Sequence, residues 1–360
     1  MKKAKKIAII VAVSMIAVGL VSIVGSLAFV RFDATKLNTM EWETKTYAVE
    51  EPFTNISVLG GDATVGIVPA TDGKCKVVCT ENDVIYDKVA VVDNTLTIER
   101  VDESEWYHNI SVHFGEIEIT VYLPESEYEA LFIDNSSGRI DVQGDFTFAE
   151  AEVSNTSGKT NFMADVEGTL KVENTSGGIY VGDNSVGDLW VKGTIGIIDV
   201  TSVCAAGNVE VNGSSGGIGV SKVECVNLSV ENSSGVMHLS EIVATGDVNV
   251  EGSSGGLHID DVECANLIGS NSSGKINCAD VIATGDINLK NSSGGIALEA
   301  CDATNLKLEA TSGSIKGTLL TEKIFQANAT SGSVKVPETT SGGVCEVTTT
   351  SGSIQMSIVE

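Results

Sequence analysis

Polar and apolar residues alternate along the last two-thirds of this chain, and the alternation restarts after each copy of a Ser-Ser-Gly-like motif. The second residue after the motif's glycine is apolar in every copy except one, where Thr160 takes its place. Alternation with a period of two predicts strands with one buried face. The repeat glycines follow one another at intervals of 19 or 20 residues and are Gly138, Gly158, Gly177, Gly196, Gly216, Gly235, Gly255, Gly274, Gly294, Gly313, Gly332 and Gly352.

The apolar positions change phase at each glycine. Leu228 and Val230 lie seven and five residues before Gly235, whereas Met237 and Leu239 lie two and four residues after it. One continuous strand cannot bury both pairs, so the motif predicts a corner with a positive φ at the glycine. Each repeat is then one coil, and twelve coils at the strand spacing give a rod of about 55–60 Å.

Stacked coils place equivalent residues above one another. An asparagine recurs three residues before the glycine in half of the copies, and we expect these side chains to form an amide ladder along the corner. They are Asn135, Asn155, Asn174, Asn232, Asn271 and Asn291.

The N-terminus has the pattern of a membrane anchor. Residues 1–6 form a basic stub, and residues 7–30 form an uncharged apolar run long enough to span a bilayer. The lysines of the stub predict a cytoplasmic N-terminus and an extracellular remainder, that is, a single-pass plasma-membrane protein. The alternative is a cleaved signal peptide, for which Ser26-Leu27-Ala28 offers a small-x-small site.

Three further segments follow this anchor. Residues 31–50 are predicted to be a stalk, residues 51–123 a β-rich cap, and residues 124–360 the solenoid repeats. The cap segment is strand-rich but out of phase with the repeats, as is typical of the atypical end units that cover a solenoid. No such unit is visible at the other end, where Ser353–Ile358 is expected to leave an open edge.

The charge of the chain excludes one class of partner. Five of the 22 basic residues lie before position 32, which leaves 17 basic and 49 acidic residues, a formal charge of −32, beyond it. Nucleic-acid binding needs a basic footprint, so we expect no nucleic-acid partner. The same excess makes a divalent cation such as calcium conceivable, although the acids lack the spacing of a calcium loop.

The cysteines follow the repeat. Cys225, Cys264, Cys278, Cys301 and Cys345 fall at positions predicted to point inward, where a thiol acts as a small apolar filler. Cys225 and Cys264 lie two coils apart, too far for a bond. Cys75 and Cys79 share one face of a predicted strand and could bond only if that strand bent.

Two histidines are the candidate metal ligands. His238 and His258 share one position in adjacent coils, so they should stack outward about 4.8 Å apart, with Asp260 two residues after His258. Two imidazoles and a carboxylate can hold a transition metal. Two unrelated surface histidines are the competing interpretation. His108 and His113 show no ligand spacing.

Aromatic residues are scarce, and only Phe325 follows Trp190. We therefore expect any sugar site in the N-terminal half, with cap packing as the alternative role of its candidate rings. Those rings are Trp42, Trp106, Tyr107 and Tyr128.

Catalytic motifs are nearly absent. Gly213–Gly217 and Gly252–Gly256 match the Gly-x-Ser-x-Gly elbow, but that elbow joins a strand to a helix in an α/β fold, and no helical pattern occurs here beyond the anchor. We expect no enzyme activity and no catalytic or cofactor-binding residues. A polysaccharide-active β-helix enzyme stays an alternative, without a carboxylate pair or basic set to support it.

Several motifs together carry a family resemblance. Lys36-Leu37-Asn38-Thr39, Lys45–Val49, the strand Ile119–Pro124 and the Ser-Ser-Gly coils resemble the bacterial "putative adhesin" family of β-strand-repeat proteins. The resemblance covers nearly the whole chain and implies a right-handed parallel β-helix on a membrane-anchored or secreted protein. It carries over no catalytic residues. The coil at Gly193–Gly196 departs from it by lacking the serine before the glycine, which predicts a local irregularity.

The sequence thus predicts an all-β, right-handed parallel β-solenoid with a β-rich cap and one transmembrane helix. Its expected function is that of a non-enzymatic cell-surface adhesin or envelope scaffold, with a cell-surface protein or glycan as the partner. The alternative is an envelope-stress sensor that acts through a membrane-protein partner.

Overall fold

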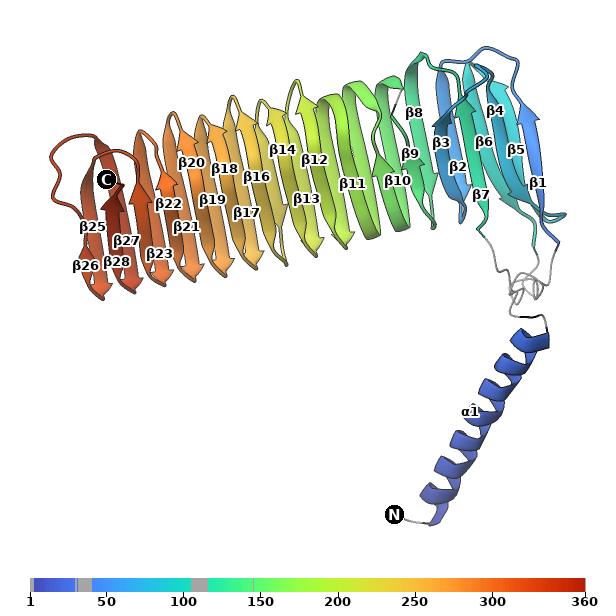
Figure 1. Cartoon of the computed structure of the whole chain (residues 1–360), viewed down its shortest axis with the longest axis horizontal. Coiled ribbons are helices and arrows are strands. Elements are labelled where there is room, and N and C mark those ends of the chain that lie inside the picture. The colour runs from blue at the N-terminus through green and yellow to red at the C-terminus, as the bar shows by residue number, and fades with distance from the viewer. Residues whose placement is uncertain (1–2, 30, 32–40, 105–115, 145, 360) are drawn as a thin grey trace.

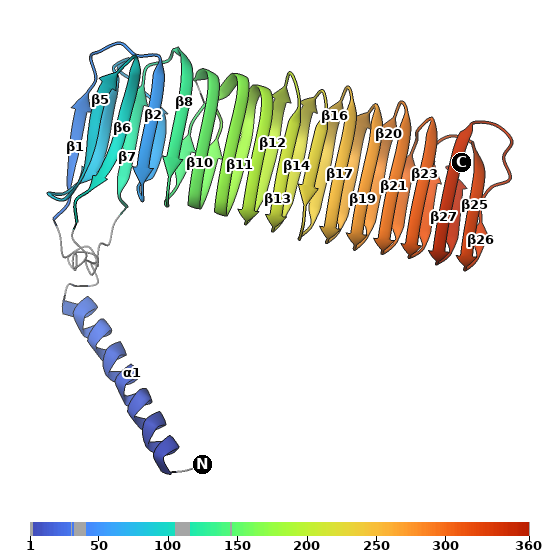
Figure 2. The ribbon, with the colours of Figure 1, turned by 180° about the vertical axis from the view of Figure 1, so that it is seen from behind.

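The protein is an all-β parallel solenoid of about 11 turns with one helix at its N-terminus. The computed structural model describes residues 3–29, 31, 41–104, 116–144 and 146–359. Figures 1 and 2 show the two long sides of the rod, with the N-terminal cap at one end and the C-terminal coils at the other. The coils are close in number to the twelve expected from the glycine spacing.

The N-terminal helix α1 comprises Lys3–Phe29. Among the residues that the structure describes, none of the helices has the length and apolarity needed to cross a bilayer. The anchor predicted for residues 7–30 stays a prediction. Residues 32–40 of the predicted stalk lie outside the described part of the chain.

The body of the rod consists of parallel strands along the long sides of each coil. Most are short, but β10 and β11 continue through the corners, and β11, with 31 residues, exceeds one coil. In chain order they are β8 (Glu127–Asn135), β9 (Ile140–Val142), β10 (Thr147–Phe162), β11 (Asp165–Ile195), β12 (Ile198–Ala205), β13 (Val209–Ser215), β14 (Ile218–Cys225), β15 (Leu228–Asn232), β16 (Met237–Ala244), β17 (Asp247–Ser254), β18 (Leu257–Cys264), β19 (Asn266–Ser273), β20 (Ile276–Ala283), β21 (Asp286–Ser293), β22 (Ile296–Cys301), β23 (Asn305–Ser312) and β24 (Ile315–Leu319).

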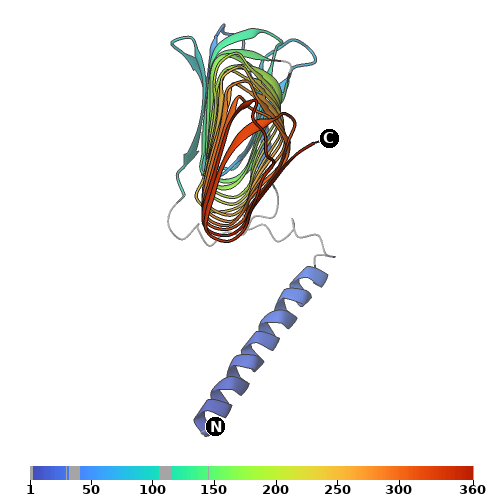
Figure 3. The same cartoon turned by 90° about the vertical axis from the view of Figure 1, so that its left-hand side faces the viewer.

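Successive coils pair in register, so each apolar residue stacks on its equivalent. Ile218 of β14 pairs with Met237 of β16, which pairs with Leu257 of β18, and all three side chains are buried. Seen from the C-terminal end in Figure 3, the coils superimpose as flattened loops around one continuous interior. Each coil therefore completes its core only against its neighbours, as expected for a solenoid.

The repeat glycines form the predicted corner. All twelve have a positive φ, from 97° to 153°. At Gly235, a Cβ atom would also lie only 1.7 Å from the carbonyl oxygen of Gly216 in the preceding coil. Both the backbone conformation and the close contact between coils exclude a side chain here.

The asparagines beside this corner do not form the amide ladder that we predicted. Each donates instead to a backbone carbonyl of the neighbouring coil, as Asn232 does to Gly216 at 2.9 Å and Asn271 to Gly255 at 2.8 Å. They are buried because they satisfy carbonyl groups that the corner leaves without a strand partner. Thr349 plays the same part for Gly313, at 2.9 Å.

A side-chain ladder does exist, at the corner before the next strand. The amides of Asn227, Asn266 and Asn305 donate to the side-chain oxygens of Asn208, Asp247 and Asp286, at 2.7 to 2.9 Å. Backbone N–H groups of the intervening coils bond to the same column, as Asp286 does to Asn266 at 2.9 Å. From Asn227 to Asn305, amides thus alternate with carboxylates along this column.

A further corner was not predicted. The residue six after the glycine is left-handed in most coils, with φ between 51° and 55° at Ser202, Lys222, Glu241, Asp261 and Asp280. This conformation shifts the buried phase by one residue, so that the seventh and ninth residues after the glycine point inward. The inward placement predicted for Cys225, Cys264, Cys278, Cys301 and Cys345 is confirmed, and all five thiols are buried.

The irregularity predicted for the coil at Gly193–Gly196 is confined to its side chains. Gly196 has a φ of 133°, like the other corner glycines, and its N–H bonds to Ser215 at 3.0 Å. Ile195 and Ile197, however, are 57% and 65% exposed, and Ile195 stands where every other copy carries serine. The irregularity thus does not extend to the conformation of the corner glycine.

The N-terminal cap contains one coil of the solenoid itself. Strands β2 and β3 pair in parallel with β8 and β9 on one side and with β6 and β7 on the other. Antiparallel strands then close the end, with β4 on β7, β1 on β4 and β5 on β6. The bounds are β1 (Glu43–Ala48), β2 (Asn55–Gly61), β3 (Thr64–Pro69), β4 (Lys76–Glu81), β5 (Ile85–Val92), β6 (Thr95–Asp102) and β7 (Glu118–Leu123).

At the C-terminal end the last two coils stack out of chain order. The final coil, β27 (Gly343–Ser351) and β28 (Ile354–Ile358), lies between β23/β24 and the preceding coil, β25 (Lys323–Ser331) and β26 (Val334–Lys335). The open edge predicted for Ser353–Ile358 is covered in part. β28 pairs with β24 along its whole length but with β26 only at Ile354 and Gln355, so Met356–Ile358 have a described strand partner on one side. Within the described residues, the outermost strands are β25 and β26.

Candidate functional site

The two candidate histidines meet as predicted. His238 on β16 and His258 on β18 are register partners, and their rings stack with centroids 4.6 Å apart and an angle of 11° between their planes. The Nδ1 atom of His258 lies 3.4 Å from the side-chain amide of Asn277 on the next coil. Burial lowers the pKa of His258, and the neighbouring His238 lowers it further.

The predicted third ligand does not complete a metal site. Asp260 follows His258 on β18 with one inward residue between them, and it lines the same groove of about 380 Å³. Within the described residues, only one group of three possible ligands has all its ligand atoms within 4.8 Å of one another, and it does not include these residues. His238, His258 and Asp260 therefore form a polar surface patch rather than a preformed metal site.

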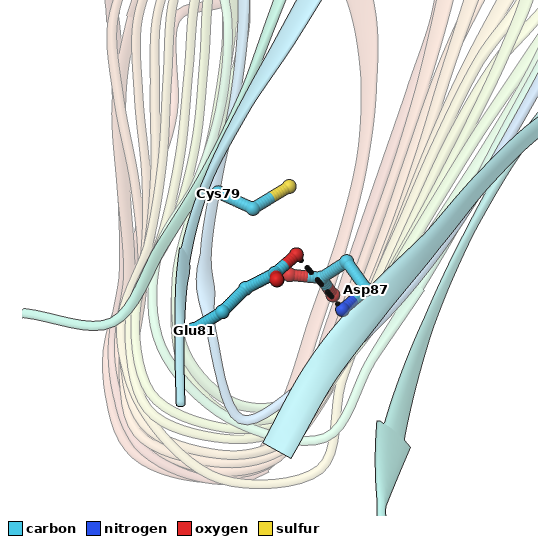
Figure 4. Close-up of side chains that lie close together, drawn as sticks. All are labelled: Cys79, Glu81 and Asp87. Carbon is cyan, nitrogen blue, oxygen red and sulfur yellow. Dashed lines mark hydrogen bonds between the residues drawn. The ribbon is translucent and has the colours of Figure 1, made fainter. Parts of the chain in front are cut away.

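The group that meets this distance criterion lies inside the cap. It consists of Cys79 and Glu81 on β4 and Asp87 on β5, all fully buried (Figure 4). The backbone N–H of Asp87 donates to the Glu81 carboxylate at 3.0 Å. A thiolate and two carboxylates are a donor set that Zn²⁺ accepts.

Basic side chains already neutralise both carboxylates. Arg100 donates to Asp87 through Nε at 3.0 Å and Nη2 at 2.6 Å, and Lys45 Nζ lies 3.1 Å from Glu81. The Tyr47 hydroxyl donates to Glu81 at 2.8 Å. Burial and the adjacent Asp87 raise the pKa of the Cys79 thiol far above its ordinary value. A metal would have to displace the arginine and deprotonate this thiol, so the residues fit a closed structural ion network better than a metal site.

The other cap cysteine is also a thiol in the structure. Cys75 lies just before β4, and burial raises its pKa to about 11. It is not bonded to Cys79. Neither side chain has the electropositive surroundings that activate a cysteine.

The serine motifs lie in strands. Ser214 and Ser215 end β13, and Ser253 and Ser254 end β17, and each strand is followed across the glycine corner by another strand. The strand-to-helix turn of a nucleophile elbow is thus absent at these four serines. The repeat alone accounts for both matches.

One of the predicted sugar-binding rings, Tyr128, serves packing. Tyr128 is 6% exposed, stacks on Phe53 with ring centroids 6.1 Å apart, and donates its hydroxyl to the Pro124 carbonyl at 2.9 Å. Trp42 lies just before β1 and is partly buried. Trp106 and Tyr107 lie outside the described residues.

A partly exposed tryptophan outside that set is better placed. Trp190 lies on the outer face of β11, with the ammonium groups of Lys171 and Lys192 at 5.3 and 5.9 Å from its ring centroid. It opens a groove of about 520 Å³ that runs across the neighbouring coils and is lined mainly by serine, asparagine and glutamate. The sequence holds the signal for it, because Lys171 and Trp190 occupy the same position in adjacent repeats.

Comparison with known proteins identifies the family of this chain but does not assign it a function. A search of curated proteins found no match. A "putative adhesin" from Bacteroides fragilis is 16% identical, with 89% of this chain and 97% of that chain covered and a TM-score of 0.28. One from Parabacteroides merdae is 10% identical, with 90% and 98% covered and a TM-score of 0.31.

A third solved structure has a different description. The "putative lipid binding protein" from Parabacteroides distasonis is 15% identical, with 90% of this chain and 98% of that chain covered and a TM-score of 0.29. Similarity this low carries no inference about a ligand. The family assignment rests on sequence, because the model of the Toastrack DUF4097 family matches residues 53–264 and 244–360. This chain is a member of the Toastrack DUF4097 family.

Proposed function

We propose that this protein is a non-enzymatic, cell-surface rod that holds a binding surface away from the membrane. In this proposal α1 anchors the chain with its N-terminus in the cytoplasm, and the solenoid projects outside. The in-register stack of coils carries the proposal, because equivalent neighbour contacts along the whole rod give a straight spacer. The alternating ladder through Asn227, Asn266 and Asn305 stiffens one corner of that spacer.

The chemistry of the described residues supports binding rather than catalysis. The one close cluster of ligand-type groups, at Cys79, is buried and charge-balanced, and the paired histidines lack a third ligand. The outer faces offer hydroxyl, amide and carboxylate groups, which suit recognition. Partners of this surface would be a cell-surface protein or glycan.

The topology can be tested through one cysteine. Cys204 is exposed, whereas six of the other thiols are buried and Cys75 is partly buried. On intact cells a membrane-impermeant maleimide should label the full-length chain, and Cys204→Ser should remove most of that labelling. Labelling that appears only after the cells are lysed would contradict an extracellular solenoid.

The binding role needs a separate test. Labelled full-length protein, held in nanodiscs, would be added to the native cell envelope, isolated wall polymers and foreign cells, with calcium varied. Saturable binding to one of these supports the proposal and names the partner class. Absence of binding to all three, with the fold verified, would reject adhesion and leave a partner within the membrane.

A further inference from the structure

The groove that begins at Trp190 crosses five successive coils on one long side of the rod. Its floor and walls come from β11, β13, β15, β17 and β19, with Asn212, Glu231, Glu251 and Ser270 as examples from the last four. At the spacing of parallel strands, five coils extend over about 19 Å. The volume of about 520 Å³ is within the range of ligand-binding clefts.

Two lysines fix the tryptophan at the end of this groove. Lys171 pairs with Glu152 at 2.8 Å and with Glu173 at 3.1 Å, so its charge is already compensated. Lys192 has no ion pair within the described residues, and its ammonium group lies over the same ring. Both ammonium groups therefore lie within cation–π distance of the indole, and Lys192 keeps hydrogen-bond donors free at the groove.

Beyond the ring, the groove is polar and able both to donate and to accept hydrogen bonds. Serine hydroxyls recur along it at Ser214, Ser233 and Ser253, and two carboxylates stand at Glu231 and Glu251. A flat aromatic surface followed by hydroxyl, amide and carboxylate groups complements a pyranose ring, which has an apolar C–H face and a hydroxylated edge.

We propose that this groove binds an uncharged glycan, with one pyranose ring lying on Trp190 and the following sugars hydrogen-bonded along the serine- and glutamate-lined coils. The inference rests on the proposed binding function and names its ligand class. Lys192 donates to a hydroxyl or ring oxygen of the first sugar.

The charge of the molecule selects the uncharged class. The chain carries a net charge of −27, and Glu231 and Glu251 lie within the groove, so a polyanion would be repelled along most of its length. A polycation would be attracted to the whole surface and would not need the aromatic ring. Only an uncharged glycan should depend on Trp190 and be insensitive to salt.

The test uses the full-length protein in a detergent without a sugar headgroup, because alkyl glycosides would compete. Titrations with oligosaccharides of glucose, mannose, xylose and N-acetylglucosamine, and with an oligogalacturonate as the anionic probe, would be followed by tryptophan fluorescence and equilibrium dialysis. We expect saturable binding of at least one uncharged probe, weakened about tenfold or more in Trp190→Ala and less in Trp190→Phe. Lys192→Ala should weaken it severalfold.

Lys290 provides the matched control. Like Lys192, it lies four residues before the repeat glycine of its coil and belongs to the same outward column, but it does not line the groove. Lys290→Ala should bind as the unchanged protein does. Hydrogen exchange across β11 to β19 would verify that each variant is folded.

The outcomes separate this inference from the proposed function. Binding to cells or wall polymers without binding of any uncharged oligosaccharide overturns the groove assignment and leaves the surface role in place. Binding that persists in Trp190→Ala, or that is confined to the anionic probe and lost with salt, also overturns it. Failure of both experiments rejects the two proposals together.

Discussion

The two ends of the rod differ in how they cover the open strand edges of the solenoid. At each end one coil is inserted out of chain order, β2/β3 beneath β6/β7 and β27/β28 beneath β25/β26. The N-terminal end then closes with antiparallel strands over a fully buried ion network. The C-terminal end stops at a parallel coil whose inward residues Phe325, Ala327 and Ala329 are only half-buried.

The difference shows what an end unit of a solenoid must provide. Open strand edges attract further strands, and both ends must limit this. The N-terminal end does so by changing strand direction and filling its interior with paired charges. The C-terminal end does so with an outermost strand of only two residues, β26, and with Lys323 and Asp302 paired at 2.8 Å near its margin.

Among changes that test the difference between the two ends, removal of residues 339–360 should reduce stability most. It deletes the only described partner of β25 and β26, together with the buried side chains of Cys345, Val347, Ile354 and Met356. Burial of such side chains is worth about 1.5–3 kcal/mol each, so the loss should exceed the stability of the terminal coils. Hydrogen exchange should show complete loss of protection in β25. Retained protection would mean that β25 can pair directly with β23.

Arg100→Met should be the next largest change, and it acts on the other end. The Arg100 side chain is 3% exposed and that of Asp87 0%, so the substitution leaves a buried carboxylate without its partner. We expect a loss of about 3–5 kcal/mol in the cap. The double variant Arg100→Met with Asp87→Leu removes both charges and should recover much of it. Urea unfolding, followed by hydrogen exchange in β4 to β6, measures the stability of the cap in both variants. Equal losses of stability in the single and double variants would refute the ion-pair explanation.

The matching substitution at the C-terminal end, Lys323→Met, should cost less, about 1–2 kcal/mol, because Asp302 is 23% exposed. Burial raises the pKa of Asp302, but hydrogen bonds from Lys323 and Thr321 outweigh this and leave it below its ordinary 3.8. A depressed carboxyl pKa contributes stability above the unfolded value, and that stability is lost as pH falls through the folded value. Acid titration of exchange in β25 should therefore show a weakening below about pH 4 that Lys323→Met abolishes.

Thr160→Val tests a position in the body of the rod, away from the C-terminal end, and should have the smallest effect on stability. Thr160 is fully buried at an otherwise apolar position, and its hydroxyl has no hydrogen-bond partner. Replacement by valine should stabilise the rod by about 1 kcal/mol, since it removes a desolvated polar group without changing the volume much. Calorimetry would measure the change in unfolding free energy, and hydrogen exchange would show which strands gain protection. Protection that rises around β10 but not in β25 would show that the two ends unfold separately.

The glycine period was sufficient to predict the coil and its buried face, because stacked repeats must bury equivalent residues. The period could not predict the order in which the end coils stack. Cys345 and Val347 follow the same alternation as Phe325 and Ala327, so periodicity cannot say which coil packs on β23. One physical distinction is side-chain size, since the inward Ala327 and Ala329 of β25 lose less buried area at an end than larger side chains would.

The same reasoning explains the outcome at the candidate sites. A shared position in adjacent repeats predicted the stacking of His238 on His258, and applied to Lys171 and Trp190 it would have found the groove. The shared position could not show whether Asp260 completes a metal site. Asp260 lies two residues further along β18 and belongs to another column of stacked residues, so its distance from the histidine rings does not follow from the repeat. The pairing of Arg100 with Asp87 depends on the antiparallel cap, for which the repeat offers no template.

The inserted C-terminal coil also separates the order of synthesis from the order of assembly. Strands β25 and β26 leave the ribosome before β27 and β28, yet their place in the finished rod depends on these later strands. If β25 docked on β23 as soon as it emerged, it would occupy the site of its successor and would have to leave again. The tip of the rod can therefore reach its final arrangement only after β27 and β28 have been made, whatever the progress of the coils behind it.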